Sequence, residues 1–486
     1  MQQRTQAVLG AALAGLLWSA TLVQAAETWT EVRSPNFRVV TNAGARQGRE
    51  VAANFERLKG VLQTVSQIST RADVPLTIVA LQSGRQLRTK IASSRENLAG
   101  LFVAGRDVNL VLLRLDLERE ERYQVAYHEY MHVLVRQTIG VVPIWLNEGL
   151  AEMYSQARLD TDDVLLGMPA NYHLAALQER TLLPLETLLA VDDDSPYYTE
   201  DNRATVFYAQ SWALTHFLML GDNGAHRPKL FALLEALDAG ATPAEATRRA
   251  IGDVPVFERQ FRAYISRYQF LALKARVPLG DDVKSAPART LTEAETLALD
   301  ATIAATLRNA TVAADLATKA IAANKSLPDA WMAQARVAYL ANDLPGAQKA
   351  FAEAIAAGSE DPLAHFGWAE LRLQETAATP GPLTDVSAAL ERSLALKPDL
   401  ARALALLGFV QARQDRNTTR AFESIKQAIT LEPGNVQHYL ILANVMHNAR
   451  DAAATEAALA RADHAASGSH EKRRVADVRQ RLAPKD

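Results

Sequence analysis

Two histidines four positions apart, with a glutamate directly after the first, make up the short sequence HEYMH, residues 128–132. On a helix, residues at this spacing lie one turn apart on one face, so His128 and His132 can bind one metal ion together. Glu129 lies further round the helix, where its carboxylate can reach a water molecule beside the metal. A match of this kind also arises by chance, so a third ligand must support it.

The candidate for the third ligand comes from the next predicted helix, PIWLNEGLAEMY, residues 143–154. The chain contains no cysteine, so only histidine, aspartate and glutamate remain as ligands. Glu148 follows His132 by sixteen positions, and Glu152 follows Glu148 by four, on the same helical face. A catalytic zinc site uses three protein ligands and leaves a position open, so a third ligand is sought on this helix.

HEYMH followed by WLNEGLAE resembles the gluzincin metallopeptidases, and the whole is similar to their small peptidase MA-like members. The resemblance implies that His128, His132 and Glu148 bind Zn²⁺ and that Glu129 is the general base. It also implies that Glu152 orients a ligand histidine, as metal sites commonly require. The resemblance covers about residues 27–275, and its sharp motifs lie at 128–154 and 206–218.

The second motif, VFYAQSWALTHFL at 206–218, resembles the segment of M1 aminopeptidases whose tyrosine stabilises the tetrahedral intermediate. It implies that Tyr208 donates to the developing oxyanion. The Lys-Gly that follows in those enzymes is replaced here by Gln210-Ser211, and the alternative is that Tyr208 is a packed core aromatic. His216 on the same segment is predicted to be a core residue.

One element of the M1 aminopeptidases is missing. Their "GAMEN" segment supplies a glutamate for the free amine of the substrate, whereas AGLFVAGRDV at 99–108 contains no acid before Asp107. An aminopeptidase is therefore not supported, and an endopeptidase is favoured. This segment can still line the cleft as a strand that pairs with an extended substrate.

The elements around these motifs predict an α+β catalytic domain. Residues 27–115 are expected to be mixed α/β, with strands at 36–41 and 75–81, a helix at 48–68, and two strands within 100–115 around a turn at 105–109. Residues 116–275 are expected to be helical, with Asp116 capping the zinc helix and Gly140 at its end. The polar residues 276–293 suggest a linker.

Residues 294–486 show a repeat of about 34 positions, the period of tetratricopeptide (TPR) repeats, which form an all-α superhelix. The clearest copy is 328–361, in which Trp331, Ala335, Ala347, Phe351 and Ala354 fall at packing positions. Further copies begin near 362, 401 and 436, a degenerate one spans 294–327, and 471–483 is expected to be a capping helix. The alternative is an alanine-rich bundle without repeats.

Residues 1–25 are predicted to be a signal peptide, with Arg4 before an apolar run at 7–23. A retained N-terminal anchor is the alternative, and no later run is apolar enough to span a membrane. We therefore expect a periplasmic or secreted protein. The composition is ordinary for a soluble protein, with 49% hydrophobic and 22% charged residues, and the net charge of −3 gives no reason to expect nucleic acid as a partner.

Together these features predict an exported zinc metallopeptidase that hydrolyses peptide bonds. A protein or peptide is the expected substrate, and the TPR repeats are expected to bind a protein partner or deliver the substrate. The alternative from another functional class is a periplasmic TPR scaffold whose peptidase-like domain is inactive or structural. A third possibility is hydrolysis of a non-peptide amide, such as a cell-wall bond, at the same site.

Overall fold

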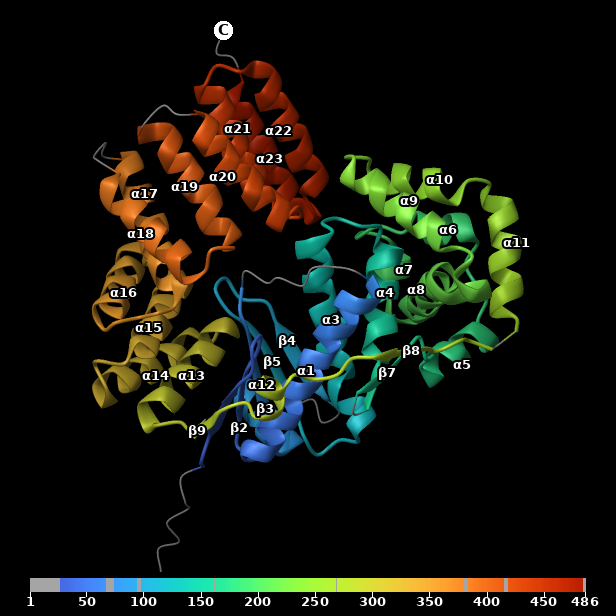
Figure 1. Ribbon diagram of the computed structural model, residues 1–486, viewed down its shortest axis with the longest axis horizontal. Coiled ribbons are helices and arrows are strands. Elements are labelled where there is room, and N and C mark those ends of the chain that lie inside the picture. The colour runs from blue at the N-terminus through green and yellow to red at the C-terminus, as the bar shows by residue number, and fades with distance from the viewer. Residues whose placement is uncertain are drawn as a thin grey trace, which may run out of the picture.

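The computed structural model describes residues 27–66, 74–93, 98–160, 162–267, 269–378, 383–414 and 418–483 (Figure 1). A mixed sheet with surrounding helices forms one part, and an arch of helices forms the other. The predicted signal peptide at 1–25 lies outside the described residues. Within the described part, no helix combines the length and apolar character that a membrane crossing requires.

A six-stranded sheet forms the base of the first part, in the order β4-β5-β3-β2-β1-β9. Strands β2, β3 and β5 run parallel, and their apolar side chains are buried, as expected of a sheet with both faces covered. Strand β4 lies at one edge, antiparallel to β5. The predicted strands are thus present as β2 to β5, and β1 and β9 were not predicted. The strands are β1 (Thr30–Arg33), β2 (Arg38–Thr41), β3 (Leu76–Leu81), β4 (Gly100–Val103), β5 (Asn109–Arg114) and β9 (Ala288–Thr290).

The helices of the first part pack around this sheet and share one large apolar core with it. They are α1 (Ala45–Ser66), α2 (Gly84–Ile91), α3 (Arg119–Thr138), α4 (Ile144–Ser155), α5 (Asn171–Glu179), α6 (Leu185–Leu189), α7 (Pro196–Thr199), α8 (Asp201–Leu220), α9 (Arg227–Asp238), α10 (Pro243–Ile251), α11 (Val254–Ile265) and α12 (Asp281–Lys284), with a 3-10 turn, η1 (Gly221–Gly224).

The region expected to be helical also contains a three-stranded sheet, β6-β7-β8. Its strands have only three or four residues, too few for a clear alternating pattern. They are β6 (Arg158–Asp160), β7 (Asp163–Leu166) and β8 (Leu273–Arg276).

The segment 276–293, which the sequence suggested as a linker, is part of the folded domain. Strand β9 pairs antiparallel with β1, with Ala288 opposite Val32. The polar residues of the segment face outward, while its few apolar side chains are buried. These buried side chains are Val277, Leu279, Val283, Ala286 and Leu291.

In the residues described beyond 292, the second part consists of five consecutive helix pairs and a final helix, which agrees with the predicted helix-pair organisation. Within the pair at 328–356, Ala335, Ala347, Phe351 and Ala354 are buried between helices. The helices are α13 (Glu293–Thr306), α14 (Ala310–Ala323), α15 (Pro328–Leu340), α16 (Leu344–Ala356), α17 (Pro362–Ala378), α18 (Thr384–Leu396), α19 (Ala401–Gln414), α20 (Thr418–Leu431), α21 (Val436–Asn448), α22 (Ala452–Ala465) and α23 (Gly468–Leu482).

Both ends of the arch contact the first part (Figure 1). At the beginning, Leu299 and Ile303 of α13 share an apolar cluster with strands β3 and β5. At the other end, Arg136 of α3 forms an ion pair of 2.8 Å with Glu471 of α23. Gly434 approaches the end of α3 so closely that a Cβ there would overlap the Arg136 carbonyl oxygen. Both ends of the repeats are therefore packed against the first part.

Candidate metal centre

Helix α3 carries the two histidines and begins at Arg119, with Glu118 as its N-cap residue. Asp116, predicted as the cap, instead forms an ion pair with Arg114 and accepts a hydrogen bond of 3.1 Å from the Gly84 amide. Gly140, just beyond the helix, has a φ of +98°, a conformation that glycine adopts without strain. The helix therefore ends where the sequence predicted, although its start differs.

Helix α4 carries Glu148, and its position depends on close packing against α8. A Cβ at Gly149 would overlap the Thr215 hydroxyl oxygen and the Ser211 carbonyl oxygen of α8. Glycine is therefore required at this position for α4 and α8 to approach as they do. This packing fixes the adjacent Glu148, which is only 2% exposed, opposite helix α3.

The three candidate ligands meet at one point. His128 Nε2 lies 3.1 Å from His132 Nε2, and Glu148 Oε2 lies 3.4 Å from the first nitrogen and 3.5 Å from the second. Donor atoms about 2.0–2.2 Å from one tetrahedral zinc ion lie roughly 3.3–3.5 Å from one another. The observed triangle therefore has the size that a zinc ion requires, without rearrangement of the side chains.

The surroundings of the Glu148 carboxylate support this assignment. Among the described residues, its Oε2 is buried and has no hydrogen-bond partner. Burial raises the pKa of this carboxyl, but the polar contacts with His128 and His132 outweigh burial and lower the pKa to about 2. Glu148 is thus a buried carboxylate with one oxygen directed at two imidazoles, an arrangement that a cation stabilises.

Glu152 lies behind the first histidine, one turn after Glu148. Its Oε1 is 3.5 Å from His128 Nδ1. Its Oε2 accepts a hydrogen bond of 2.9 Å from the Tyr172 hydroxyl and lies 3.2 Å from the Nε2 of the fully buried His173. Tyr172 and His173 on α5 therefore hold the carboxylate that faces the ligand histidine.

Tyr198 on α7 is a site residue that the sequence analysis missed. Its hydroxyl donates a hydrogen bond of 2.9 Å to Glu148 Oε1, the oxygen that does not face the histidines. Burial and the Glu148 carboxylate raise the pKa of Tyr198, so its hydroxyl keeps its proton at neutral pH. No motif marked Tyr198, because it lies on a four-residue helix in a polar segment.

Tyr208 on α8 lies beside this group, with its ring 6.3 Å from that of Tyr198. Burial raises the pKa of Tyr208, and the carboxylates of Glu148, Glu152 and Glu129 raise it further. Burial lowers the pKa of His132, but Glu148 and, to a smaller extent, Glu129 raise it overall. The Glu129 carboxylate thus contributes to the raised pKa of both Tyr208 and His132.

His216 lies in the core, away from this centre. Its Nε2 lies 2.9 Å from the Leu271 carbonyl oxygen, and its Nδ1 lies 2.7 Å from the Tyr264 hydroxyl. Both contacts are satisfied by a neutral ring in which Nε2 carries the proton. Burial lowers the pKa of His216 to about 4.

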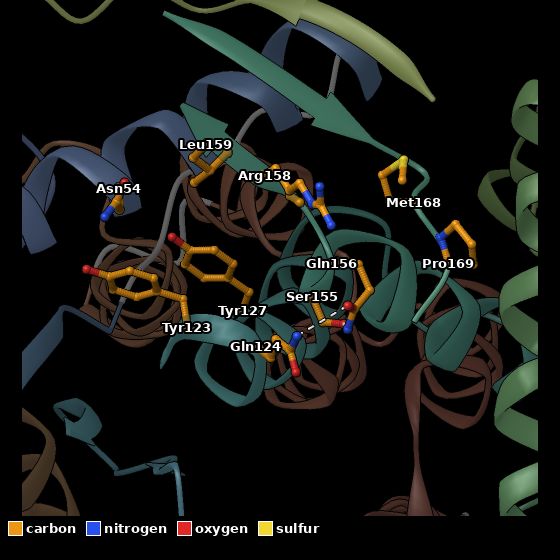
Figure 2. A pocket seen from close by; sticks show the side chains of 11 residues that line it. Asn54, Tyr123, Gln124, Tyr127, Ser155, Gln156, Arg158, Leu159, Met168 and Pro169 are labelled. Atoms are coloured by element: carbon orange, nitrogen blue, oxygen red, sulfur yellow. Dashed lines mark hydrogen bonds between the residues drawn. The ribbon is translucent and has the colours of Figure 1, made fainter. Parts of the chain in front are cut away.

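A separate pocket of about 140 Å³ lies where α3 begins and α4 ends (Figure 2). Tyr123 and Tyr127 of α3 stack at 5.4 Å in its wall, and Gln124 donates a hydrogen bond to Gln156 across it. None of the candidate metal ligands lines this pocket, so it is distinct from the metal centre.

Comparison with known proteins gives one family match and three structurally similar proteins. Residues 58–267 match the Peptidase MA superfamily. A search of curated proteins finds no match. YrrB, described as a TPR protein with an unusual peptide-binding site, is 14% identical with a TM-score of 0.31, covering 38% of this chain and 92% of its own. MamA is 13% identical with a TM-score of 0.28, covering 38% and 98%. Yeast Tom70 is 14% identical with a TM-score of 0.30, covering 64% and 71%.

These TM-scores are too low to support an argument, so the repeat architecture rests on the helix pairs themselves. The chain combines a part that matches the Peptidase MA superfamily over residues 58–267 with a helical repeat part.

Proposed function

We propose that this protein is an exported, zinc-dependent metallopeptidase of gluzincin type that cleaves within peptide chains. The observation that carries the proposal is the triangle of His128 Nε2, His132 Nε2 and the buried Glu148 Oε2, with sides of 3.1–3.5 Å. The Peptidase MA superfamily match over 58–267 supports it, because the three residues lie within that range. The proposed export rests on the apolar run at 7–23 behind Arg4.

The chemistry follows from the positions of the side chains. A zinc ion held by His128, His132 and Glu148 would supply Lewis acidity and a water molecule of lowered pKa. Glu129 would accept the proton of the attacking water and pass it to the leaving amine. The Tyr208 hydroxyl, which is protonated at neutral pH as tyrosines ordinarily are, would donate to the oxyanion. Glu152 would keep His128 oriented by accepting its Nδ1–H.

The deciding experiment combines metal content with peptide hydrolysis. Purified protein should contain about one zinc per chain, and His132→Ala should lose it. Glu129→Gln should keep the zinc and lose hydrolysis of an unstructured protein substrate such as casein. Absence of metal after zinc is supplied would contradict the proposed metal site, and undiminished hydrolysis by Glu129→Gln would contradict the role of the base.

The same experiment separates the proposal from the scaffold alternative. Stoichiometric zinc without hydrolysis of any protein or peptide tested would favour a structural or inactive peptidase-like domain. A non-peptide amide substrate would be indicated if Glu129→Gln abolished hydrolysis of cell-wall fragments while the wild type left proteins intact.

A further inference from the structure

The turn between β4 and β5, residues 104–108, projects into the inner side of the helical arch (Figure 1). Arg106 at its tip forms an ion pair with Glu370 of α17. The Arg106 guanidinium also lies 4.2 Å from the centre of the Tyr339 ring on α15. The Arg106 carbonyl oxygen accepts a hydrogen bond of 2.8 Å from Arg402 of α19. Three successive repeats therefore contact this one residue.

Asp107, the next residue of the turn, makes the most buried of these contacts. Its two carboxylate oxygens face the Arg336 guanidinium of α15 at 3.1 and 2.8 Å, and both side chains are only 15% exposed. Arg336 is itself held by a hydrogen bond of 3.0 Å to Thr302 of α13. A paired arginine and carboxylate of this kind specify geometry as well as charge.

All these polar contacts come from the first helix of each pair: α13, α15, α17 and α19. Those helices line the inner side of the arch, the side on which helical repeat proteins present an extended binding surface. The residual cavity at the junction is only about 10 Å³, roughly the room of one water molecule. The turn therefore fills this surface closely, in the way that a bound ligand fills its site.

We propose that the inner face of the repeats is a binding site for an arginine followed by an acidic residue in a turn, and that the protein's own residues 104–108 occupy it. A partner protein that presents such a segment binds by replacing this turn. Glu370 and the Tyr339 ring recognise the arginine, and Arg336 recognises the acid. A cavity of about 680 Å³ beside Asp107 and Arg336, lined by both parts of the chain, gives the incoming segment room to enter.

The replacement has a structural consequence for the first part. The turn ends strand β4, which lies at the sheet edge beside α3. Release of the turn removes the contacts that hold the end of β4 against the repeats, and leaves β4 with its pairing to β5 and its packing against α3. Partner binding at the repeats is thereby linked to the order of β4, and this linkage does not depend on whether the metal centre is catalytic.

The test uses the full chain and a cyclised, fluorescein-labelled peptide with the sequence of residues 102–109, FVAGRDVN. The variant Arg106→Ala/Asp107→Ala should vacate the site and bind this peptide at least tenfold more tightly than the wild type does. A peptide with alanine at both positions should not bind either protein. Equal affinity of the FVAGRDVN peptide for the two proteins, or no binding to the variant, would overturn the proposal.

A charge exchange keeps the test valid if the vacated variant is poorly folded. Asp107→Arg should speed amide hydrogen exchange in residues 100–103 at least tenfold, and Asp107→Arg with Arg336→Asp should restore slow exchange. Arg372→Ala, which removes exposed ion pairs of Arg372 on α17 with Glu375 and with Asp385 of α18, serves as the control and should leave exchange in β4 unchanged. If both Asp107→Arg proteins exchange equally, the Asp107–Arg336 pair does not hold the turn.

Discussion

At the residue scale, the proposed site depends on hydroxyl groups and carboxylates that contact the candidate ligands on the side away from the proposed metal ion. Tyr198 fixes one oxygen of Glu148, and Tyr172 and His173 fix one oxygen of Glu152. These contacts leave the remaining oxygens facing the two ligand histidines. Substitutions of these contacting residues are therefore expected to change metal affinity without removing a ligand.

Tyr198→Phe should weaken zinc binding about tenfold, because outer partners of metal ligands typically contribute 10- to 100-fold. The variant keeps the aromatic ring beside Phe207 and Tyr208 and loses only the hydrogen bond to Glu148. Competition with a zinc-chelating dye measures the change. Ser393→Ala on α18 of the repeats loses a hydrogen bond of 2.8 Å to the Pro362 carbonyl oxygen and should bind zinc as the wild type does. Unchanged affinity in Tyr198→Phe would remove this residue from the site.

The lowered pKa of His216 predicts how acid changes the free energy of unfolding. Its pKa is about 4 in the fold, against 6.5 for the free group, so the unfolded chain binds the proton more readily. The contribution of neutral His216 to the free energy of unfolding is therefore fully present above pH 6.5. It is lost as the pH falls toward 4, by roughly 3 kcal/mol in all. Thermal unfolding of His216→Gln should lose this part of the acid sensitivity. An identical pH dependence of the unfolding temperature in the wild type and in His216→Gln would contradict this role of His216.

At the element scale, the packing of α4 against α8 sets the position of Glu148. Gly149→Ala should overlap α8, destabilise the fold by about 1–3 kcal/mol and weaken zinc binding, since α4 must move. Gly358→Ala is a useful comparison. It lies in the repeats at a φ of +85° with open space around it, so it should cost stability through backbone strain alone. Chemical unfolding and zinc titration of both variants separate the two effects, and equal zinc affinities would contradict the role of α4 packing.

Sequence patterns identified those elements whose side chains repeat regularly. The buried strands β3 and β5, helix α3 and the helix pairs of the repeats have apolar residues at strand or helix spacing, so their ranges could be predicted. Strands β8 and β9 could not, because each is short and polar and pairs with a strand distant in the chain. Strands β6 and β7 pair with each other locally, but they have too few residues for a clear alternating pattern.

The same distinction applies to the candidate site. His128 and His132 on α3, and Glu148 and Glu152 on α4, are each one helical turn apart, so spacing alone places each pair on one face. The family resemblance, and not the spacing, predicted that the two helices meet. Tyr198, Tyr172 and His173 come from other segments and meet the site only through tertiary packing. Nothing in the local sequence around Tyr198 signals the hydrogen bond to Glu148, because that bond joins residues fifty positions apart.

At the scale of the whole molecule, zinc binding should stabilise the first part of the chain. A ligand present at a hundred times its dissociation constant adds about 2.7 kcal/mol to the stability of the state that binds it. Wild-type protein treated with a chelator should therefore unfold a few degrees lower than protein supplied with zinc. His132→Ala should unfold at the same temperature with and without zinc, and a zinc-dependent shift in that variant would point to a second metal site.

Strand β9 also governs the order in which the chain can fold. Thr30 pairs with Thr41 on one side and with Thr290 on the other, so the outer edge of β1 stays open until residue 290 has been synthesised. A fragment cut at 267, where the superfamily match ends, would leave that edge unpaired and prone to pairing with other chains. The large sequence separation makes the closing step slow relative to the formation of local helices. During synthesis, the outer edge of β1 therefore stays unpaired until the whole region between β5 and β9 has been made.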